Sequence, residues 1–152
     1  MAEKSAGLLV FRRRAGIVEF LLVHPGGPFW KNKDEGAWSI PKGLIDEDEE
    51  TLTAASREFE EEVGIAVDGD FAALTPLKQK SGKTVHAWLV EADLDLTAFR
   101  SNVFAMEWPR RSGRKIEVAE VDRAAYFPPE VSLKKILPGQ AGFIAQALGL
   151  IR

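Results

Sequence analysis

The sequence predicts an α+β domain in which helices pack in layers against a mixed β-sheet. Apolar runs typical of strands and amphipathic stretches typical of helices occur at separate places along the chain. The 152 residues fit one domain, and a composition of 45% hydrophobic and 28% charged residues is that of an ordinary globular protein. Because neither an internal repeat nor a linker divides the sequence, we expect one domain over residues 1–152.

The N-terminal part of the chain is expected to form a β-hairpin followed by a loop. Two short apolar runs flank a basic turn with a glycine, and the next segment contains Pro-Gly-type breaks. The expected elements are strands at 6–11 and 18–23, a loop at 24–36 and a short extended piece at 37–40.

The clearest predicted helix lies between residues 52 and 63. Leu52, Ala55, Phe59 and Val63 recur at spacings of three and four and so share one helical face. Gly64 is a natural stop. Beyond it we expect a hairpin of 71–79 and 83–91 around residues 80–82, a helical turn in 95–101, strands at 102–108 and 115–118, a helical turn starting at 120–122, and helices at 130–137 and 140–150.

This helix is strongly acidic. Residues 46–62 contain nine acidic residues and one arginine, whereas the whole chain has a net charge of −3. Glu58 and Glu62 are four residues apart, so their like charges repel on one helix face. A solvated acidic face would explain the composition, but a divalent cation would turn the repulsion into coordination.

The amino acids that are scarce restrict the chemistry. The chain has no cysteine and two histidines, His24 and His86, which we expect to be structural. Oxygen ligands therefore dominate any metal site, which favours Mg²⁺, Mn²⁺ or Ca²⁺. The N-terminus lacks signal-peptide character, and no apolar run reaches the ~20 residues that cross a bilayer. We expect a cytoplasmic protein without a membrane or duplex nucleic acid partner.

A motif extends from the end of the extended piece through the acidic helix. Trp38-Ser39-Ile40-Pro41-Lys42-Gly43 is followed after five residues by Glu49 and, after seven more, by Arg57-Glu58-Phe59-Glu60-Glu61-Glu62-Val63-Gly64-Ile65. This resembles the Nudix hydrolase signature GX5EX7REUXEEXGU, in which U is a bulky apolar residue. Every fixed position matches at the right spacing over residues 43–65. The order of strands and helices is also similar to the Nudix α/β/α sandwich, with a mixed sheet.

The resemblance implies roles for the matched residues. Glu58 and Glu62 would be the principal ligands of Mg²⁺ or Mn²⁺, and the carbonyl of Gly43 would face the metal. Glu61 would be a further ligand, either directly or through a water molecule. Arg57 would hold a glutamate in place, and Glu49 would either orient the loop and helix or contact the metal through a water molecule. Catalysis would thus depend on Arg57, Glu58, Glu61 and Glu62. The general base stays open between Glu58 and an acid from a later loop.

Residues outside the motif are candidates for that acid and for substrate binding. Among Glu107, Glu117 and Glu120 we favour Glu107 or Glu117. Arginine suits phosphate, so the basic cluster with Arg110 and Arg111, which would otherwise be a solvated loop, is a candidate phosphate-binding site. Aromatic rings stack on nucleobases, so Phe29 and Trp30, which would otherwise pack the long loop, are candidate contacts for a base. The substrate-binding candidates are Lys42, Arg110, Arg111, Phe29 and Trp30, with Lys31 and Lys33 as further phosphate contacts.

These observations predict a Mg²⁺-dependent pyrophosphohydrolase. Nudix family members cleave a diphosphate linked to another group, and a cation neutralises the phosphate oxygens and lowers the pKa of a bound water. The lead-in Trp38–Gly43 is similar to that of members acting on dinucleoside polyphosphates, while a nucleoside triphosphatase is the nearest alternative. The rivals are a Nudix-fold module that binds nucleotides without turnover and an unrelated fold with a structural acidic helix. The protein would be a monomer or a homodimer.

Overall fold

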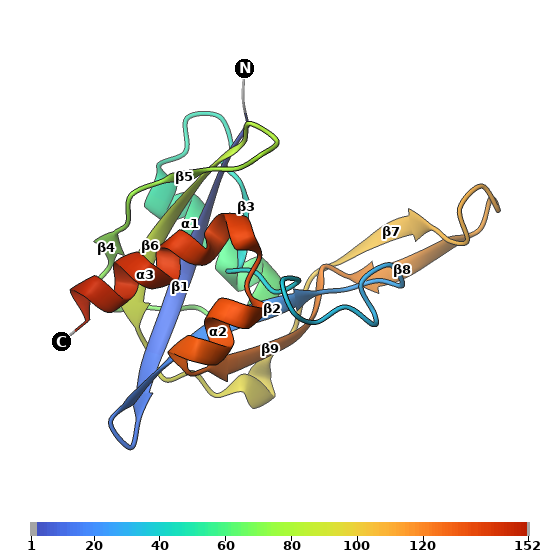
Figure 1. The fold of residues 1–152 in the computed structure, drawn as a ribbon. Helices are drawn as coiled ribbons and strands as arrows, with labels where there is room; N and C mark the ends of the chain where they lie inside the picture. The colour runs from blue at the N-terminus through green and yellow to red at the C-terminus, as the bar shows by residue number, and fades with distance from the viewer. Residues whose placement is uncertain (1–2, 152) are drawn as a thin grey trace.

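The computed structural model describes residues 3–151, so Met1, Ala2 and Arg152 of the predicted domain lie outside it. A mixed sheet of seven strands forms its centre (Figure 1). The main path runs β4-β6-β1-β2-β9, with β3 paired to β1 and β5 paired to β6. The strands are β1 (Lys4–Arg14), β2 (Ile17–Pro25), β3 (Lys42–Leu44), β4 (Ala72–Ala73), β5 (Leu77–Lys78), β6 (Thr84–Glu91) and β9 (Val121–Phe127).

Helices cover both faces of this sheet, as the sandwich prediction requires. Helix α1 (Thr51–Val63) lies on one face, and α2 (Pro129–Lys135) and α3 (Ala141–Leu150) lie on the other (Figure 1). Alternate residues of β1 therefore enter two separate cores: Leu9 packs with Phe143 of α3, and Leu8 with Phe59 of α1. Burial on both faces explains why β1 and β2 are continuous apolar runs.

Most sequence-predicted elements are confirmed. The first hairpin forms between β1 and β2, α1 starts one residue before the predicted helix, and η1 (Leu96–Ala98) supplies the helical turn. The sheet is mixed because β1 pairs with β6 in parallel over Lys4↔Thr84 to Phe11↔Glu91. The predicted strand 71–79 is interrupted, since β4 and β5 are separated by Leu74-Thr75-Pro76 and proline has no amide to donate.

The prediction of a helical turn starting at Glu120 is wrong. Glu120 is followed directly by β9, which pairs antiparallel with β2 from Phe20↔Phe127 to Pro25↔Val121. Acidic residues before an apolar position are typical of a helix start, but the open edge of β2 decides the local structure here.

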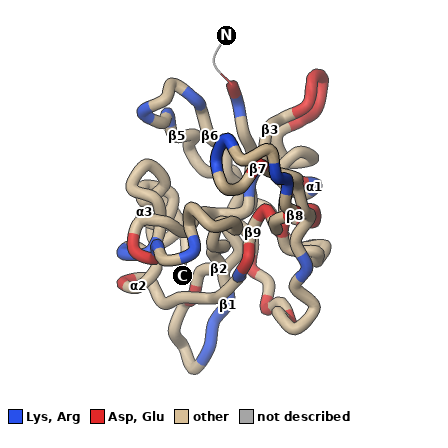
Figure 2. The backbone as a smooth tube through the Cα atoms, turned by 90° about the vertical axis from the view of Figure 1, so that its right-hand side faces the viewer, with Lys and Arg blue, Asp and Glu red and all other residues tan. Residues whose placement is uncertain are grey.

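Strands β7 (Val103–Glu107) and β8 (Lys115–Ala119) form a separate two-stranded sheet that extends away from the body of the molecule (Figure 1). Arg110 and Arg111 lie in its terminal turn, and Figure 2 shows basic residues at this turn. None of the helices described within residues 3–151 is long and apolar enough to cross a membrane.

Candidate active site

The acidic motif folds into a strand, a loop and a helix that meet at one place. β3 pairs antiparallel with β1, with Gly43 opposite Ala6, and the chain then turns into α1. The apolar face of α1, including Ala55, Phe59 and Val63, is buried against the sheet, which fixes the rotation of the helix. Gly64 ends the helix in the left-handed conformation with φ 79°, which glycine adopts without a steric penalty.

Gly43 has a structural reason to be glycine. A Cβ atom at this position would collide with the carboxylate of Glu58. The strand backbone therefore approaches the helix carboxylate as closely as it does only because residue 43 has no side chain. This contact places the peptide of Gly43 next to Glu58.

Arg57 holds three motif glutamates. Its Nε and Nη2 donate to the two carboxylate oxygens of Glu49 at 2.9 Å each, and Nη1 donates to Glu58 at 2.8 Å and to Glu61 at 3.2 Å. Nη2 also donates to the backbone carbonyl of Leu44 at 3.1 Å. The hydrogen bonds from Arg57 lower the pKa of Glu49 to about 2. A planar guanidinium can make such a bidentate contact and lysine cannot.

Glu62 is the buried carboxylate of the site. It is 7% exposed, and burial, reinforced by the negative charge of Glu120, raises the pKa of Glu62 to about 8. Burial also raises the pKa of Glu58, against the opposing effect of Arg57. Burial disfavours the ionised form of both carboxylates, and the charge of a bound cation would favour that form. The two side chains are therefore suited to a cation.

Glu120 joins these carboxylates from the other side of the chain. It lies between β8 and β9 and lines both cavities next to the acidic helix. The acids favoured from sequence are elsewhere: Glu107 accepts the backbone amides of Arg111 at 2.8 Å and Gly113 at 3.1 Å, and Glu117 lies on exposed β8 opposite Ala105. The sequence does contain a signal for Glu120, because this residue separates the two segments that form β8 and β9.

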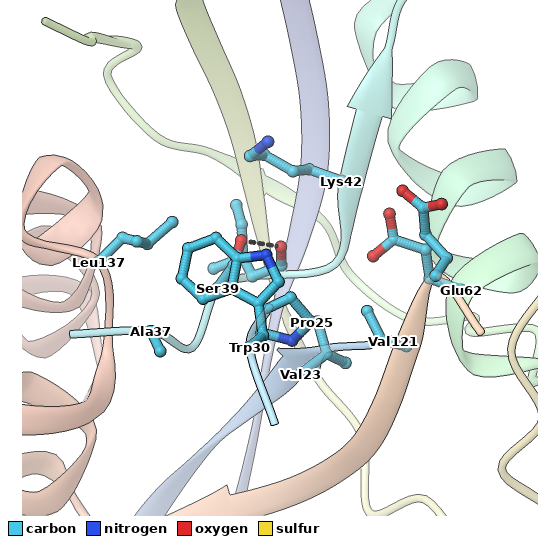
Figure 3. A pocket seen from close by; sticks show the side chains of 11 residues that line it. Val23, Pro25, Trp30, Ala37, Ser39, Lys42, Glu62, Val121 and Leu137 are labelled. Carbon is cyan, nitrogen blue, oxygen red and sulfur yellow. Dashed lines mark hydrogen bonds between the residues drawn. The ribbon is translucent and has the colours of Figure 1, made fainter. Parts of the chain in front are cut away.

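Two cavities adjoin at Lys42, Glu62 and Glu120. The first, of about 190 Å³, has apolar walls from Val23, Val121 and Leu137 and an aromatic wall from Trp30. Figure 3 shows Trp30 and Glu62 facing this cavity from opposite sides, with Lys42 above them. The second, of about 370 Å³, is polar and includes Gly43 and Glu58. A ligand with an aromatic part and an anionic part would fit across both cavities.

The other predicted substrate contacts are not brought to these cavities. Phe29 is 60% exposed and is not among the cavity-lining residues, although its ring packs edge-on against Trp30 with centroids 5.1 Å apart. Lys33 lies over the Phe29 ring at 3.7 Å. Arg110 and Arg111 sit at the end of the β7–β8 hairpin, outside both cavities.

The donor set fits Mg²⁺ or Mn²⁺. Among residues 3–151, no three acidic or imidazole side chains already converge as a closed cation site. Glu58, Glu62 and Glu120 nevertheless line one polar cavity together with Gly43. Mg²⁺ usually takes one or two carboxylates and fills its other positions with waters and substrate phosphates, so an open site of oxygen donors suits it.

The raised pKa of Glu62 predicts how the metal-free protein responds to pH. A carboxyl group whose pKa is higher in the folded state than the unfolded value near 4.5 stabilises the fold below pH 4.5, and this contribution is lost as pH rises through 8. Glu62→Gln keeps a neutral side chain at every pH. In EDTA, thermal unfolding should show equal Tm at pH 5 and a Tm at least about 4 °C higher for the variant at pH 8.5.

Magnesium should reverse this difference, because it binds the ionised carboxylate. Adding Mg²⁺ should raise the Tm of the wild-type protein more at pH 8 than at pH 6, and should raise that of Glu62→Gln little at either pH. A Tm difference that is independent of pH in EDTA would contradict the assigned burial effect on Glu62.

Comparison with known proteins identifies the family. The NUDIX domain family matches residues 1–147, and the chain therefore belongs to this family. A bis(5'-nucleosyl)-tetraphosphatase [asymmetrical] of Caenorhabditis elegans is 40% identical over 65 residues, which are 43% of this chain and 43% of the relative. The rat protein of the same name is 33% identical over 103 residues, 60% of this chain and 66% of the relative. The alignments thus span only 43% and 66% of the length of these two curated relatives.

Solved structures confirm the fold. A C. elegans Ap4A hydrolase in a binary complex superposes with a TM-score of 0.65 at 22% identity and covers 98% of this chain and 97% of its own. The NUDIX domain of Shewanella oneidensis NrtR, complexed with ADP ribose, gives a TM-score of 0.71 at 17% identity over 100% of this chain and 90% of its own. The α+β sandwich with a mixed sheet is therefore the Nudix fold.

Proposed function

We propose that this chain is a metal-dependent Nudix pyrophosphohydrolase that cleaves a phosphoanhydride bond in dinucleoside polyphosphates. The observation that carries the proposal is the junction of the two cavities at the buried Glu62. An aromatic wall lies on one side of this carboxylate, and Glu58 and Gly43 lie on the other. The curated relatives named bis(5'-nucleosyl)-tetraphosphatase support the dinucleoside class.

Different residues bind the base, the phosphate chain and the cation. Trp30 offers a face for stacking a nucleobase, and the apolar walls around it exclude water from that end of the ligand. The ammonium of Lys42, at the junction, attracts the phosphate chain. Glu58 and Glu62 would hold the cation, with Glu61 and the Gly43 carbonyl as further ligands, and Arg57 keeps Glu58 and Glu61 oriented.

The chemical step is a water attack on phosphorus. The bound cation supplies charge neutralisation on the phosphate oxygens. Glu120 is the later acid in the polar cavity, and it accepts the proton that the attacking water loses. An oxygen–phosphorus bond forms while the anhydride bond on the opposite side breaks, and its electron pair leaves with the departing phosphate. Glu58 is the alternative base.

A substrate panel tests the proposal. The purified chain is assayed with a dinucleoside tetraphosphate, nucleoside triphosphates, a nucleotide sugar and ADP-ribose, in Mg²⁺ and in EDTA. We expect the highest kcat/KM with the dinucleoside tetraphosphate, with products split into a nucleoside triphosphate and a monophosphate, and activity only with metal.

Two other outcomes would contradict it. A preference for a single nucleoside triphosphate would make the chain a triphosphatase. Tight binding of these ligands without metal-dependent turnover of any of them would make it a nucleotide-binding module instead.

A further inference from the structure

His24 is a buried ionisable group that the proposed chemistry does not use. It lies near the end of β2, is 0% exposed, and lines neither cavity of the site. Its Nδ1 lies 2.8 Å from a carboxylate oxygen of Asp122, and its Nε2 lies 2.6 Å from the backbone carbonyl oxygen of Lys33. Both partners are hydrogen-bond acceptors. A neutral imidazole has one N–H, so the ring can donate to both acceptors at once only if it carries two protons.

Asp122 reaches His24 because of an irregularity in the sheet. The pairing of β2 with β9 passes from His24↔Arg123 to Pro25↔Val121, which leaves Asp122 as the extra residue of a β-bulge. A bulge changes the direction of a side chain, and here it brings the carboxylate to the buried ring. Arg123 also contacts Asp122 at 3.5 Å, and Trp38 packs on the His24 ring with centroids 5.3 Å apart.

The other side of the imidazole reaches the aromatic wall of the first cavity. The backbone amide of Lys33 donates to the carbonyl of Trp30 at 2.9 Å, so the Lys33 peptide connects His24 to Trp30. At the opposite end of the path, Asp122 is two residues from Glu120, whose carbonyl accepts the amide of Gly26 at 3.1 Å. A continuous chain of contacts thus runs Asp122, His24, Lys33, Trp30 and joins the two sides of the cavity.

We infer that His24 is a positioning residue, a doubly protonated imidazole that ties the loop of residues 26–36 to the β9 bulge and so holds Trp30 across the cavity from Glu62 (Figure 3). The inference rests on the proposed function only where it takes Trp30 to stack on a nucleobase of the substrate. Packing alone holds this loop weakly, since ten of its eleven residues are not buried and the buried one is a glycine. The contacts of His24 therefore take the place of packing as the source of its order.

The test compares His24→Gln with His86→Gln, because His86 lies on β6 and makes no contact in this path. For His24→Gln we expect about a tenfold increase in KM for a dinucleoside tetraphosphate, with kcat within about threefold of wild type. Amide hydrogen exchange in residues 30–36 should be at least about tenfold faster, and exchange in α1 unchanged. His86→Gln should change neither.

A double-mutant cycle and a spectrum complete the test. Asp122→Ala should weaken binding in the same way, and the double variant should be no worse than His24→Gln because both changes break one path. In the wild-type protein, a nitrogen NMR spectrum near neutral pH should show both His24 ring nitrogens protonated.

A neutral His24 ring, or unchanged exchange of residues 30–36 in both His24→Gln and Asp122→Ala, would overturn the inference. The spectrum requires no variant and the exchange measurement requires no turnover. If the chain hydrolysed none of the tested diphosphates, the proposed function would fail while these two measurements would still decide the role of His24.

Discussion

Replacing Glu62 with glutamine is expected to lower kcat by about a thousandfold while the fold is retained. Glu62 is the carboxylate shared by the aromatic and the polar cavity, and it is almost fully buried. An amide has nearly the same shape but no negative charge, so it would bind a divalent cation weakly and would leave the charge of the phosphate chain without compensation. The measurement is steady-state hydrolysis of the best substrate at saturating Mg²⁺.

The matched control is Glu60→Gln. Glu60 lies on the same helix and loses the same charge, but it is exposed and lines neither cavity. Its kcat should stay within about twofold of wild type. If Glu62→Gln kept wild-type activity, the assignment of Glu62 as a metal ligand would be wrong.

Replacing Gly43 with alanine is expected to lower kcat/KM by about a hundredfold. The added methyl group would occupy the position of the Glu58 carboxylate and displace it. The displaced group is the end of a flexible side chain, so the protein should fold and lose no more than a few degrees in Tm. The loss of activity with little loss of stability separates this effect from unfolding, and both are measured on the same preparation.

Gly149→Ala is the control for this substitution. Gly149 lies in α3, and a Cβ atom there would meet no other atom within 4 Å. Alanine favours helix by about 1 kcal/mol over glycine, so Tm should be equal or slightly higher and activity unchanged. Full activity in Gly43→Ala would show that the close approach of β3 to Glu58 has no catalytic importance.

Local sequence patterns were sufficient for most of the helices and for the acidic motif. The spacing of Leu52, Ala55, Phe59 and Val63 predicts which face of α1 is buried, and this face in turn directs Glu58 and Glu62 to the same side. The first hairpin was equally predictable, because a turn with a glycine separates two apolar runs. These features depend on residues close in sequence.

The later part of the site could not be predicted in this way. Whether Glu107, Glu117 or Glu120 reaches the acidic helix depends on where β8 ends and where β9 pairs with β2. The residues at the start of β9 are, moreover, typical of a helix start. Charge alone predicts phosphate binding for Arg110 and Arg111, yet their hairpin extends away from the body of the molecule and they line neither cavity (Figure 1). The charge of a segment can be read from its sequence, but the position of that segment relative to the site cannot.

The family, the carboxylates of α1 and the expectation of an oxygen-ligated cation follow from the sequence alone, because a motif of fixed spacing on one helix specifies its own geometry. Only the folded chain shows that Glu120 lies beside them, that Trp30 rather than Phe29 lines the cavity, and that His24 bridges Lys33 and Asp122. His24 and Asp122 are 98 residues apart in the chain. Contacts across such a separation arise only when the sheet assembles, so no local pattern encodes them.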